Sequence, residues 1–202
     1  VKPAVPADFD TKGSTTQINA VDAQGRFVSI TFTLFNRFGA CALSPRTGII
    51  LNNGMAWFDA RAGRTTSMLP NAYAHSNMCP AIITKDDAPV MAVGASGANM
   101  IVPAVAQFIA LHLCANLDVE EAAHRPRLHL GPEGKMSVDA DMMPAEIAAL
   151  ERHWRLTPAQ TTVMPRPFGS PSMIGKDANG FVGIPDTSYP AAYAAAYLNG
   201  SS

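Results

Sequence analysis

The first candidate for chemistry in this sequence is a threonine doublet, Thr15-Thr16, which directly follows Gly13-Ser14. Cleavage of the peptide bond between Ser14 and Thr15 would give Thr15 a free α-amine with a pKa of about 8. One residue would then carry both a nucleophilic hydroxyl and its base. The plainer interpretation is that Thr15 simply opens a strand, because β-branched side chains suit strands. Thr15 is therefore a candidate nucleophile, and the bond between Ser14 and Thr15 is a candidate cleavage site.

A second candidate is the small-residue turn at residues 94–99, Gly-Ala-Ser-Gly-Ala-Asn. It lies between a predicted strand and a predicted helix, where successive backbone N–H groups suit an oxyanion. A tight turn with close packing explains the same residues. The nucleophile elbow of α/β-hydrolases requires Gly-x-Ser-x-Gly, and Ala98 stands at its last position. The sequence therefore disfavours a serine hydrolase of that type.

Other polar residues have simpler explanations than catalysis. His75 and Cys79 lack further ligands at metal-binding spacing. His124 and His129 flank Arg-Pro-Arg, with no carboxylate or cysteine at ligand spacing. We predict structural roles for all four, and no metal or cofactor.

The elements that position Thr15 begin with a predicted hairpin of residues 15–21 and 27–33. Its turn has Asp22 first and Gly25 last, as type I turns prefer. Apolar and polar residues alternate along the second strand, so one face is apolar. Thr31 and Thr33 share the polar face, within reach of Thr15.

The rest of the chain alternates short strands with helices, which predicts an α+β fold with antiparallel sheets and flanking helices. Residues 1–14 are predicted to be an extended tail or linker. The predicted strands are residues 48–52, 81–85, 89–93, 172–175 and 180–184, and the predicted helices are residues 100–115, 118–125 and 144–154.

Composition limits the classes of partner. The net charge of −1 gives no electrostatic reason for binding nucleic acid or an anionic membrane, and no apolar run is long enough to span a bilayer. Hydrophobic residues make up 48% and charged residues 15%, which predicts that another chain covers one face. The odd number of cysteines, 3, argues against a disulfide framework and favours a reducing compartment, cytoplasmic rather than periplasmic.

Several motifs in order resemble the small subunit of γ-glutamyltransferases, over nearly all of residues 15–202. The resemblance begins with the hairpin and continues through matching segments. These are residues 15–22 (TTQINAVD), 28–34 (VSITFTL), 44–53 (SPRTGIILNN), 76–80 (SNMCP), 94–98 (GASGA), Pro126-Arg127 and Gly169-Ser170.

This resemblance implies an N-terminal-nucleophile hydrolase, with this chain as the small-subunit half of an αββα sandwich. Residues 1–14 would then be the end of the large-subunit region, and residues 15–202 the small-subunit domain. A precursor would cleave itself before Thr15, and its large subunit would be the partner, in a heterodimer or a dimer of heterodimers. The implied substrate is a γ-glutamyl compound, as in glutathione metabolism, or another small amide.

The resemblance also implies roles for individual residues. Thr15 is the nucleophile, and the Thr33 hydroxyl binds it and supports autoprocessing. Gly97 and Ala98 offer the two N–H groups of an oxyanion hole. Ser76 and Asn77 take the places of two serines that hold the substrate carboxylate.

Two substitutions depart from the family at the substrate's α-ammonium. Phe35 replaces an asparagine, and the following Asn36 is expected to point to the other face of the strand. Trp57 replaces the acidic residue that pairs with the ammonium. This pair favours an apolar or small uncharged acyl group. Two alternatives stay open: an acylase or amidase acting on another amide, and an inactive homologue serving as a binding or scaffold subunit.

Overall fold

The structure is a computed structural model that describes residues 14–131, 134–162, 166–177 and 180–197. Its residues form two compact units, described separately below. The first unit contains the residues up to Thr16 together with Phe32–Asn77, and the second contains Gln17–Thr31 together with the residues from Met78 onward. The predicted tail lies outside the described residues except for Ser14.

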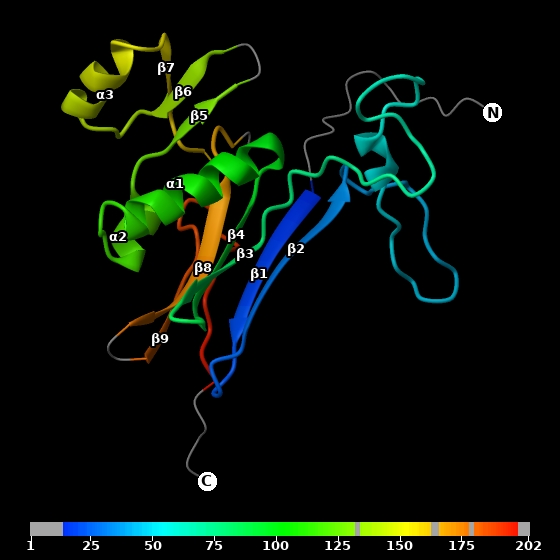
Figure 1. The fold of residues 1–202 in the computed structure, drawn as a ribbon, viewed down its shortest axis with the longest axis horizontal. Helices are drawn as coiled ribbons and strands as arrows, with labels where there is room; N and C mark the ends of the chain where they lie inside the picture. The colour runs from blue at the N-terminus through cyan, green and yellow to red at the C-terminus, as the bar shows by residue number, and fades with distance from the viewer. Residues whose placement is uncertain (1–13, 132–133, 163–165, 178–179, 198–202) are drawn as a thin grey trace. The chain divides into compact units, whose positions relative to one another are not determined.

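Strands β1 (Ser14–Val21) and β2 (Phe27–Phe35) form the predicted hairpin, as a two-stranded sheet (Figure 1). In the turn, the Gly25 N–H donates to the Asp22 carbonyl oxygen at 2.9 Å. The Asp22 carboxylate also accepts the backbone N–H groups of Gln24 and Arg26. The Asp-to-Gly turn prediction is therefore confirmed.

The hairpin's two faces differ as predicted. Within the second unit, one face carries polar side chains, and Gln17 accepts a hydrogen bond from Thr31 at 2.6 Å. The opposite face carries Ile18, Val28 and Ile30, which are 53%, 48% and 48% exposed. The apolar face of the hairpin is therefore the one that the described chain leaves exposed, and it is called the bare face below.

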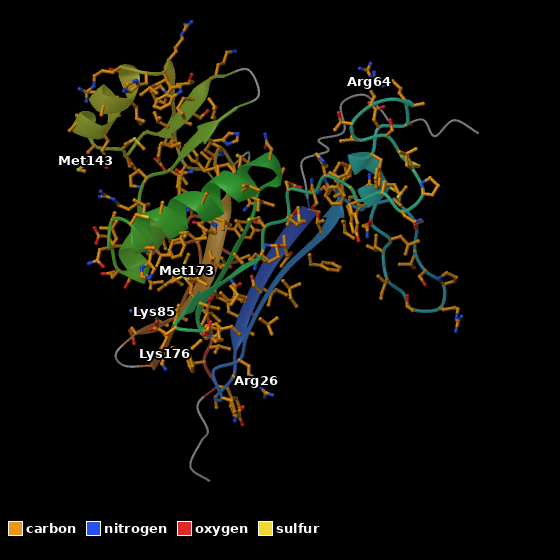
Figure 2. All side chains as sticks on the ribbon, viewed as in Figure 1. Arg26, Arg64, Lys85, Met143, Met173 and Lys176 are labelled. Atoms are coloured by element: carbon orange, nitrogen blue, oxygen red, sulfur yellow. The ribbon has the colours of Figure 1, made fainter. Side chains whose placement is uncertain are left out.

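The core of the second unit lies between a sheet and two helices. Strands β3 (Ala81–Lys85), β4 (Ala88–Ser96), β8 (Ser170–Asp177) and β9 (Gly180–Ile184) pair antiparallel in the order β3-β4-β8-β9. Alternate residues of β4 face helices α1 (Ile101–Leu113) and α2 (Val119–His124), with Met173 of β8 in the same core (Figure 2). On α1, the buried residues Ile101, Ala104, Val105 and Phe108 have the spacing of one helix face.

The other face of this sheet meets the polar face of the hairpin. The Asn19 side-chain amide donates to the Ser172 carbonyl oxygen at 2.9 Å, and the Ser29 hydroxyl donates to the Val93 carbonyl oxygen at 3.1 Å. A Cβ at Gly94 would collide with the end of the Gln17 side chain, so a larger residue there would displace Gln17 from its hydrogen bonds with Ser29 and Thr31. Helices, sheet and hairpin therefore form three successive layers in this unit (Figure 1).

A smaller core supports a second sheet of the same unit. Strands β5 (Leu128–Leu130), β6 (Met136–Asp139) and β7 (Leu156–Ala159) form it, with β5 and β6 antiparallel and β6 and β7 parallel. Helix α3 (Pro144–Glu151) contributes Ile147 and Leu150 to this core, as predicted, but ends before the expected residue 154.

The first unit is mostly loop. The predicted buried strand at residues 48–52 is wrong, because Gly48 has a φ of +69° and only an isolated bridge joins Leu43 and Ile50. Ile49 is 58% exposed, so nothing in the described chain buries this segment. One short 3₁₀ helix, Gly54–Trp57, follows it.

These elements confirm the predicted α+β class. In the part of the chain that the structure describes, no helix is long and apolar enough to cross a membrane.

Candidate active site

The start of β1 and the end of β2 bring two hydroxyl groups together in the first unit. Thr15 Oγ1 lies 3.0 Å from Thr33 Oγ1, as the hairpin pattern predicts. The Thr33 hydroxyl also donates to the Ser14 carbonyl oxygen at 3.0 Å. The candidate nucleophile and the carbonyl group of the candidate cleavage site therefore share one hydrogen-bonding partner.

The direction of these hydrogen bonds follows from the protons available. A threonine hydroxyl has a single proton to donate, and that of Thr33 goes to Ser14. The Thr15 hydroxyl must then donate to Thr33 Oγ1. The same oxygen accepts the backbone N–H of Phe35 at 2.9 Å, which fixes its position.

Strand β2 ends at Phe35 in a left-handed backbone conformation. The φ of Phe35 is +71°, which is uncommon for a bulky side chain. The next N–H, of Asn36, donates to Asn53 Oδ1 at 3.0 Å, and the Asn53 N–H donates to the Leu34 carbonyl oxygen at 3.1 Å. Asn36 lies beyond the end of β2, where regular alternation stops, so its expected orientation toward the opposite face stays a prediction.

The two substituted residues, Phe35 and Trp57, are in direct contact. Their ring centroids lie 4.8 Å apart at an interplanar angle of 79°, an edge-to-face arrangement. A Cβ at Gly54 would lie 2.8 Å from the Trp57 ring, so the ring packs on bare backbone. The structure thus joins two residues that are far apart in the sequence into one aromatic wall.

The turn with Gly97 and Ala98 belongs to the second unit and follows β4. Gly97 has a φ of +133° and Ala98 a φ of +52°, and the Met100 N–H donates to the Gly97 carbonyl oxygen at 3.0 Å. A Cβ at Gly97 would lie 2.9 Å from the Gly169 Cα, so backbone passes close to backbone here. The turn leads into α1 through a 3₁₀ segment, Ala98–Met100, and the oxyanion role of its N–H groups stays a prediction.

One side chain near this turn was not anticipated. Arg166 donates from Nη1 to Ser96 Oγ at 3.1 Å and stacks on the Tyr189 ring with 4.9 Å from Cζ to the centroid. Ser96 and Arg166 are 70 positions apart, and no local pattern links them.

Ser76 and Asn77 close the first unit, with Ser76 exposed and Asn77 half-buried. The hydrogen bonds given above connect Thr15 with Thr33, Ser14 and Phe35, so roles for Ser76 and Asn77 stay predictions. Among the described residues, no group of three or more His, Cys, Asp or Glu side chains could hold a metal ion.

A buried ion pair lies elsewhere in the second unit. Arg127 Nη2 lies 3.4 Å from Asp186 Oδ2, with both side chains almost fully buried. Burial alone would raise the pKa of Asp186, but Arg127 and the hydrogen bonds from Ser188 and Ser170 lower it below its usual range. Burial lowers the pKa of His129. Neither group touches the residues that the sequence singled out for chemistry.

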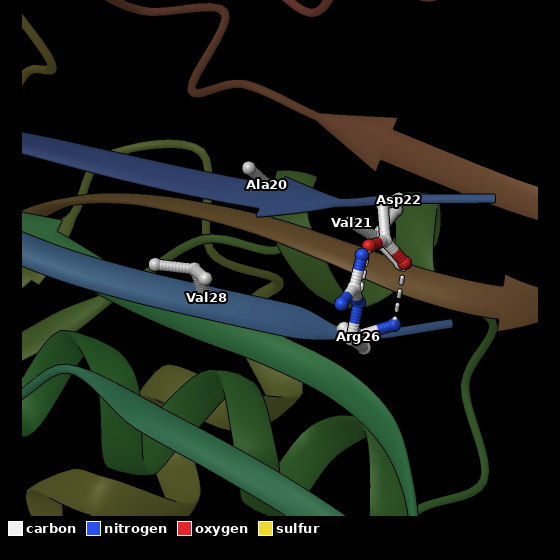
Figure 3. A pocket seen from close by; sticks show the side chains of 5 residues that line it. All are labelled: Ala20, Val21, Asp22, Arg26 and Val28. Atoms are coloured by element: carbon white, nitrogen blue, oxygen red, sulfur yellow. Dashed lines mark hydrogen bonds and ion pairs between the residues drawn. The ribbon is translucent and has the colours of Figure 1, made fainter. Parts of the chain in front are cut away.

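An open pocket of about 380 Å³ lies at the turn end of the hairpin (Figure 3). Its lining residues are Ala20, Val21, Asp22, Arg26 and Val28. Asp22 and Arg26 form an ion pair of 2.5 Å with each other, so the pocket offers no free charge.

Comparisons with known proteins agree with the motifs. A family model described as gamma-glutamyltranspeptidase matches residues 2–196. The chain is 36% identical over 118 residues to the glutathione hydrolase proenzyme of Bacillus subtilis (strain 168), covering 58% of this chain and 20% of the relative. It is 36% identical over 114 residues to the acylase ACY 1 proenzyme of Pseudomonas sp. (strain V22), covering 56% and 20%. The matches span about a fifth of the length of these curated relatives.

The fold comparison gives the same result. A crystal structure of a mutant gamma-glutamyltranspeptidase from Helicobacter pylori matches with a TM-score of 0.71 at 24% sequence identity. The match covers 86% of this chain and 99% of that one, so the two chains share a fold over nearly the whole of the solved chain.

Proposed function

The chain belongs to the gamma-glutamyltranspeptidase family, and from this premise we propose that it is the catalytic part of an N-terminal-threonine amidohydrolase or acyltransferase. The proposal includes autoprocessing before Thr15. The observation that carries it is the chain of hydrogen bonds from the Thr15 hydroxyl to Thr33 Oγ1 and from the Thr33 hydroxyl to the Ser14 carbonyl oxygen. The relatives described as proenzymes support cleavage of a precursor.

Autoprocessing would begin with attack of Thr15 Oγ on the Ser14 carbonyl carbon. The negative charge then develops on the Ser14 oxygen, which the Thr33 hydroxyl already contacts at 3.0 Å. Collapse of this intermediate breaks the bond to the Thr15 nitrogen, which takes up the proton that the Thr15 hydroxyl loses. Water hydrolyses the resulting ester, leaving a carboxylate on Ser14 and a free hydroxyl and amine on Thr15.

The freed amine would serve as the base for turnover. With a pKa of about 8, it can accept the hydroxyl proton when Thr15 attacks the carbonyl carbon of an amide substrate. The amide's amine leaves, an ester forms on Thr15, and water or an acceptor amine releases the acyl group. We assign oxyanion stabilisation to the N–H groups of Gly97 and Ala98, because a glycine-led turn that opens a helix presents successive N–H groups.

A larger subunit from the same precursor is the proposed partner, in a heterodimer or a dimer of heterodimers. Two observations support it. The matched segment is about a fifth of the curated proenzymes, and the bare face of the hairpin carries Ile18, Val28 and Ile30 about half exposed. Residues 1–14 would then be the end of that subunit, and residues 15–202 the small-subunit domain.

The test uses the full-length protein and its Thr15→Ala variant. We expect mass spectrometry and N-terminal sequencing of the unmodified protein to detect a chain that begins at Thr15, and the variant to stay uncleaved. Cleavage of the variant at the same bond would mean that an external protease acts, and an uncleaved native protein would contradict the proposal. Covalent labelling of Thr15 by an electrophilic amide analogue would exclude a purely scaffolding role.

A further inference from the structure

The position of Phe35 is tied to the catalytic hydroxyl pair of the proposed function. Its N–H donates to Thr33 Oγ1, the oxygen that lies 3.0 Å from Thr15 Oγ1. The bonds between Asn53 and the Leu34–Asn36 backbone hold the end of β2 against the segment that carries Trp57. The aromatic wall of Phe35 and Trp57 therefore starts two hydrogen bonds from the nucleophile.

The wall offers a substrate apolar surface. Both residues are half-buried, and their edge-to-face contact at 4.8 Å joins the end of β2 to the end of the 3₁₀ helix Gly54–Trp57. Because Gly54 has no Cβ, the Trp57 ring packs directly on its backbone, which defines the position of the ring. Hydrocarbon that packs on such rings is stabilised by the apolar area that it removes from water.

Charge in the first unit disfavours a cationic substrate group. Within residues 14–16 and 32–77, Asp59 is the only acidic residue, while arginines stand at positions 37, 46, 61 and 64. Arg61 binds both oxygens of Asp59, at 2.9 Å from Nε and 2.7 Å from Nη2. These hydrogen bonds from Arg61 lower the pKa of Asp59, so the carboxylate stays ionised and engaged at neutral pH.

We propose that Phe35 and Trp57 select an acyl group that bears no ammonium, and that γ-glutamyl amides are poor substrates of this protein. The proposal rests on the proposed function and names the substrate class of the same site. A γ-glutamyl group carries an ammonium, which needs a carboxylate or hydrogen-bond acceptors when it leaves water. The aromatic wall offers neither, and the carboxylate of Asp59, the one acidic residue of the unit's described residues, is already paired with Arg61.

The first experiment compares substrates on the processed full-length protein. Three p-nitroanilides have acyl chains of equal length: γ-L-glutamyl; glutaryl, which lacks only the ammonium; and pentanoyl, which lacks both charges. We expect kcat/KM for the glutaryl or the pentanoyl substrate to exceed that for the γ-glutamyl substrate by about tenfold or more. A ratio of this size corresponds to the loss of one charge-assisted hydrogen bond to the ammonium. The proposal is overturned if neither exceeds γ-glutamyl, because the rings would then be accepting the ammonium by cation–π contact.

The second experiment restores a partner for the ammonium. Trp57→Asp should raise the ratio of γ-glutamyl to glutaryl turnover by about tenfold, since it supplies the missing carboxylate. Tyr73→Asp is the matched control, because it adds the same charge to the same unit at a residue that is 96% exposed, and it should leave the ratio unchanged. An equal rise in both variants would mean that net charge alone sets the preference, against our proposal.

A variant that relieves the backbone guards against a folding defect. The backbone at position 35 has a φ of +71°, which asparagine tolerates better than phenylalanine. Phe35→Asn also removes one of the two rings of the aromatic wall. It should also raise the γ-glutamyl to glutaryl ratio. Failure of the proposed function is seen separately, as absence of a chain that begins at Thr15, whereas failure of this inference is seen only in the substrate ratio of the cleaved protein.

Discussion

At the scale of single residues, Thr33 is the side chain on which the candidate chemistry depends most. Its oxygen accepts from Thr15 and from the Phe35 N–H, and its only proton points to the Ser14 carbonyl oxygen. A hydroxyl so constrained cannot rotate away without losing three hydrogen bonds. We infer that it is preorganised to stabilise charge on the Ser14 oxygen.

Substitution of Thr33 tests this role. Thr33→Val keeps the β-branched shape that suits a strand but removes the donor, so cleavage before Thr15 should slow by on the order of 100-fold or more. Thr33→Ser keeps the hydroxyl and should cleave within about tenfold of the native rate. The rate is measured as the appearance of the chain that begins at Thr15. Native-like cleavage of Thr33→Val, in a protein with an unchanged melting temperature, would remove Thr33 from the mechanism.

At the scale of elements, the sequence predicts local structure well and long-range pairing poorly. The hairpin was predictable because its alternation and its Asp22-to-Gly25 turn are local signals, and α1 because its apolar run is long. Strands β5, β6 and β7 span three to four residues each, too short for a periodic pattern to stand out. The segment at residues 48–52 has strand-like composition, but its backbone hydrogen bonds to residues 40–44 give one isolated bridge and no continuous strand.

The same division applies to the candidate site. Thr15 and Thr33 meet within one hairpin, so their proximity follows from strand register. Two other contacts depend on the paths of long loops: Phe35 with Trp57, and Arg166 with Ser96. A single sequence carries no local signal that predicts such loop paths.

Gly169, the residue directly before β8, supports the turn at Gly97 through close backbone packing. A Cβ at Gly169 would lie 2.6 Å from the Met100 carbonyl oxygen and 2.8 Å from the Ala104 Cβ, and neither atom can move without shifting the turn or α1. We therefore expect Gly169→Ala to lower the free energy of unfolding by about 1–3 kcal/mol. In the control Gly131→Ala, the new Cβ would meet only the Lys135 carbonyl oxygen at 3.5 Å, an ordinary contact.

Denaturant unfolding of the full-length protein measures both glycine variants. The Gly131→Ala change should stay within about 0.5 kcal/mol of the native value, as surface substitutions do. Equal stability of the two variants would show that the turn yields easily, and its proposed role in holding N–H groups for an oxyanion would lose its structural support.

At the scale of the whole molecule, the layers of the second unit are incomplete. Helices α1 and α2 cover one face of the four-stranded sheet, and the polar face of the hairpin meets the other. Beyond the hairpin, nothing in the described chain covers Ile18, Val28 and Ile30. A hydrophobic content of 48% is high for a chain that leaves such a face in water. The large subunit of the proposed function would supply a fourth layer that covers this face.

A charge placed on this face distinguishes a covered surface from a solvated one. If another part of the full-length protein packs on the hairpin, Ile30→Asp both removes apolar contact and buries a carboxylate, so it should destabilise the protein by at least about 2–3 kcal/mol. The control Ala23→Asp adds the same charge to the exposed turn of the same hairpin and should cost less than about 0.5 kcal/mol. Melting temperatures and co-purification of the two processed chains measure the difference. If Ile30→Asp and Ala23→Asp behave alike, the face is open to water in the assembled protein, and the large subunit must bind elsewhere.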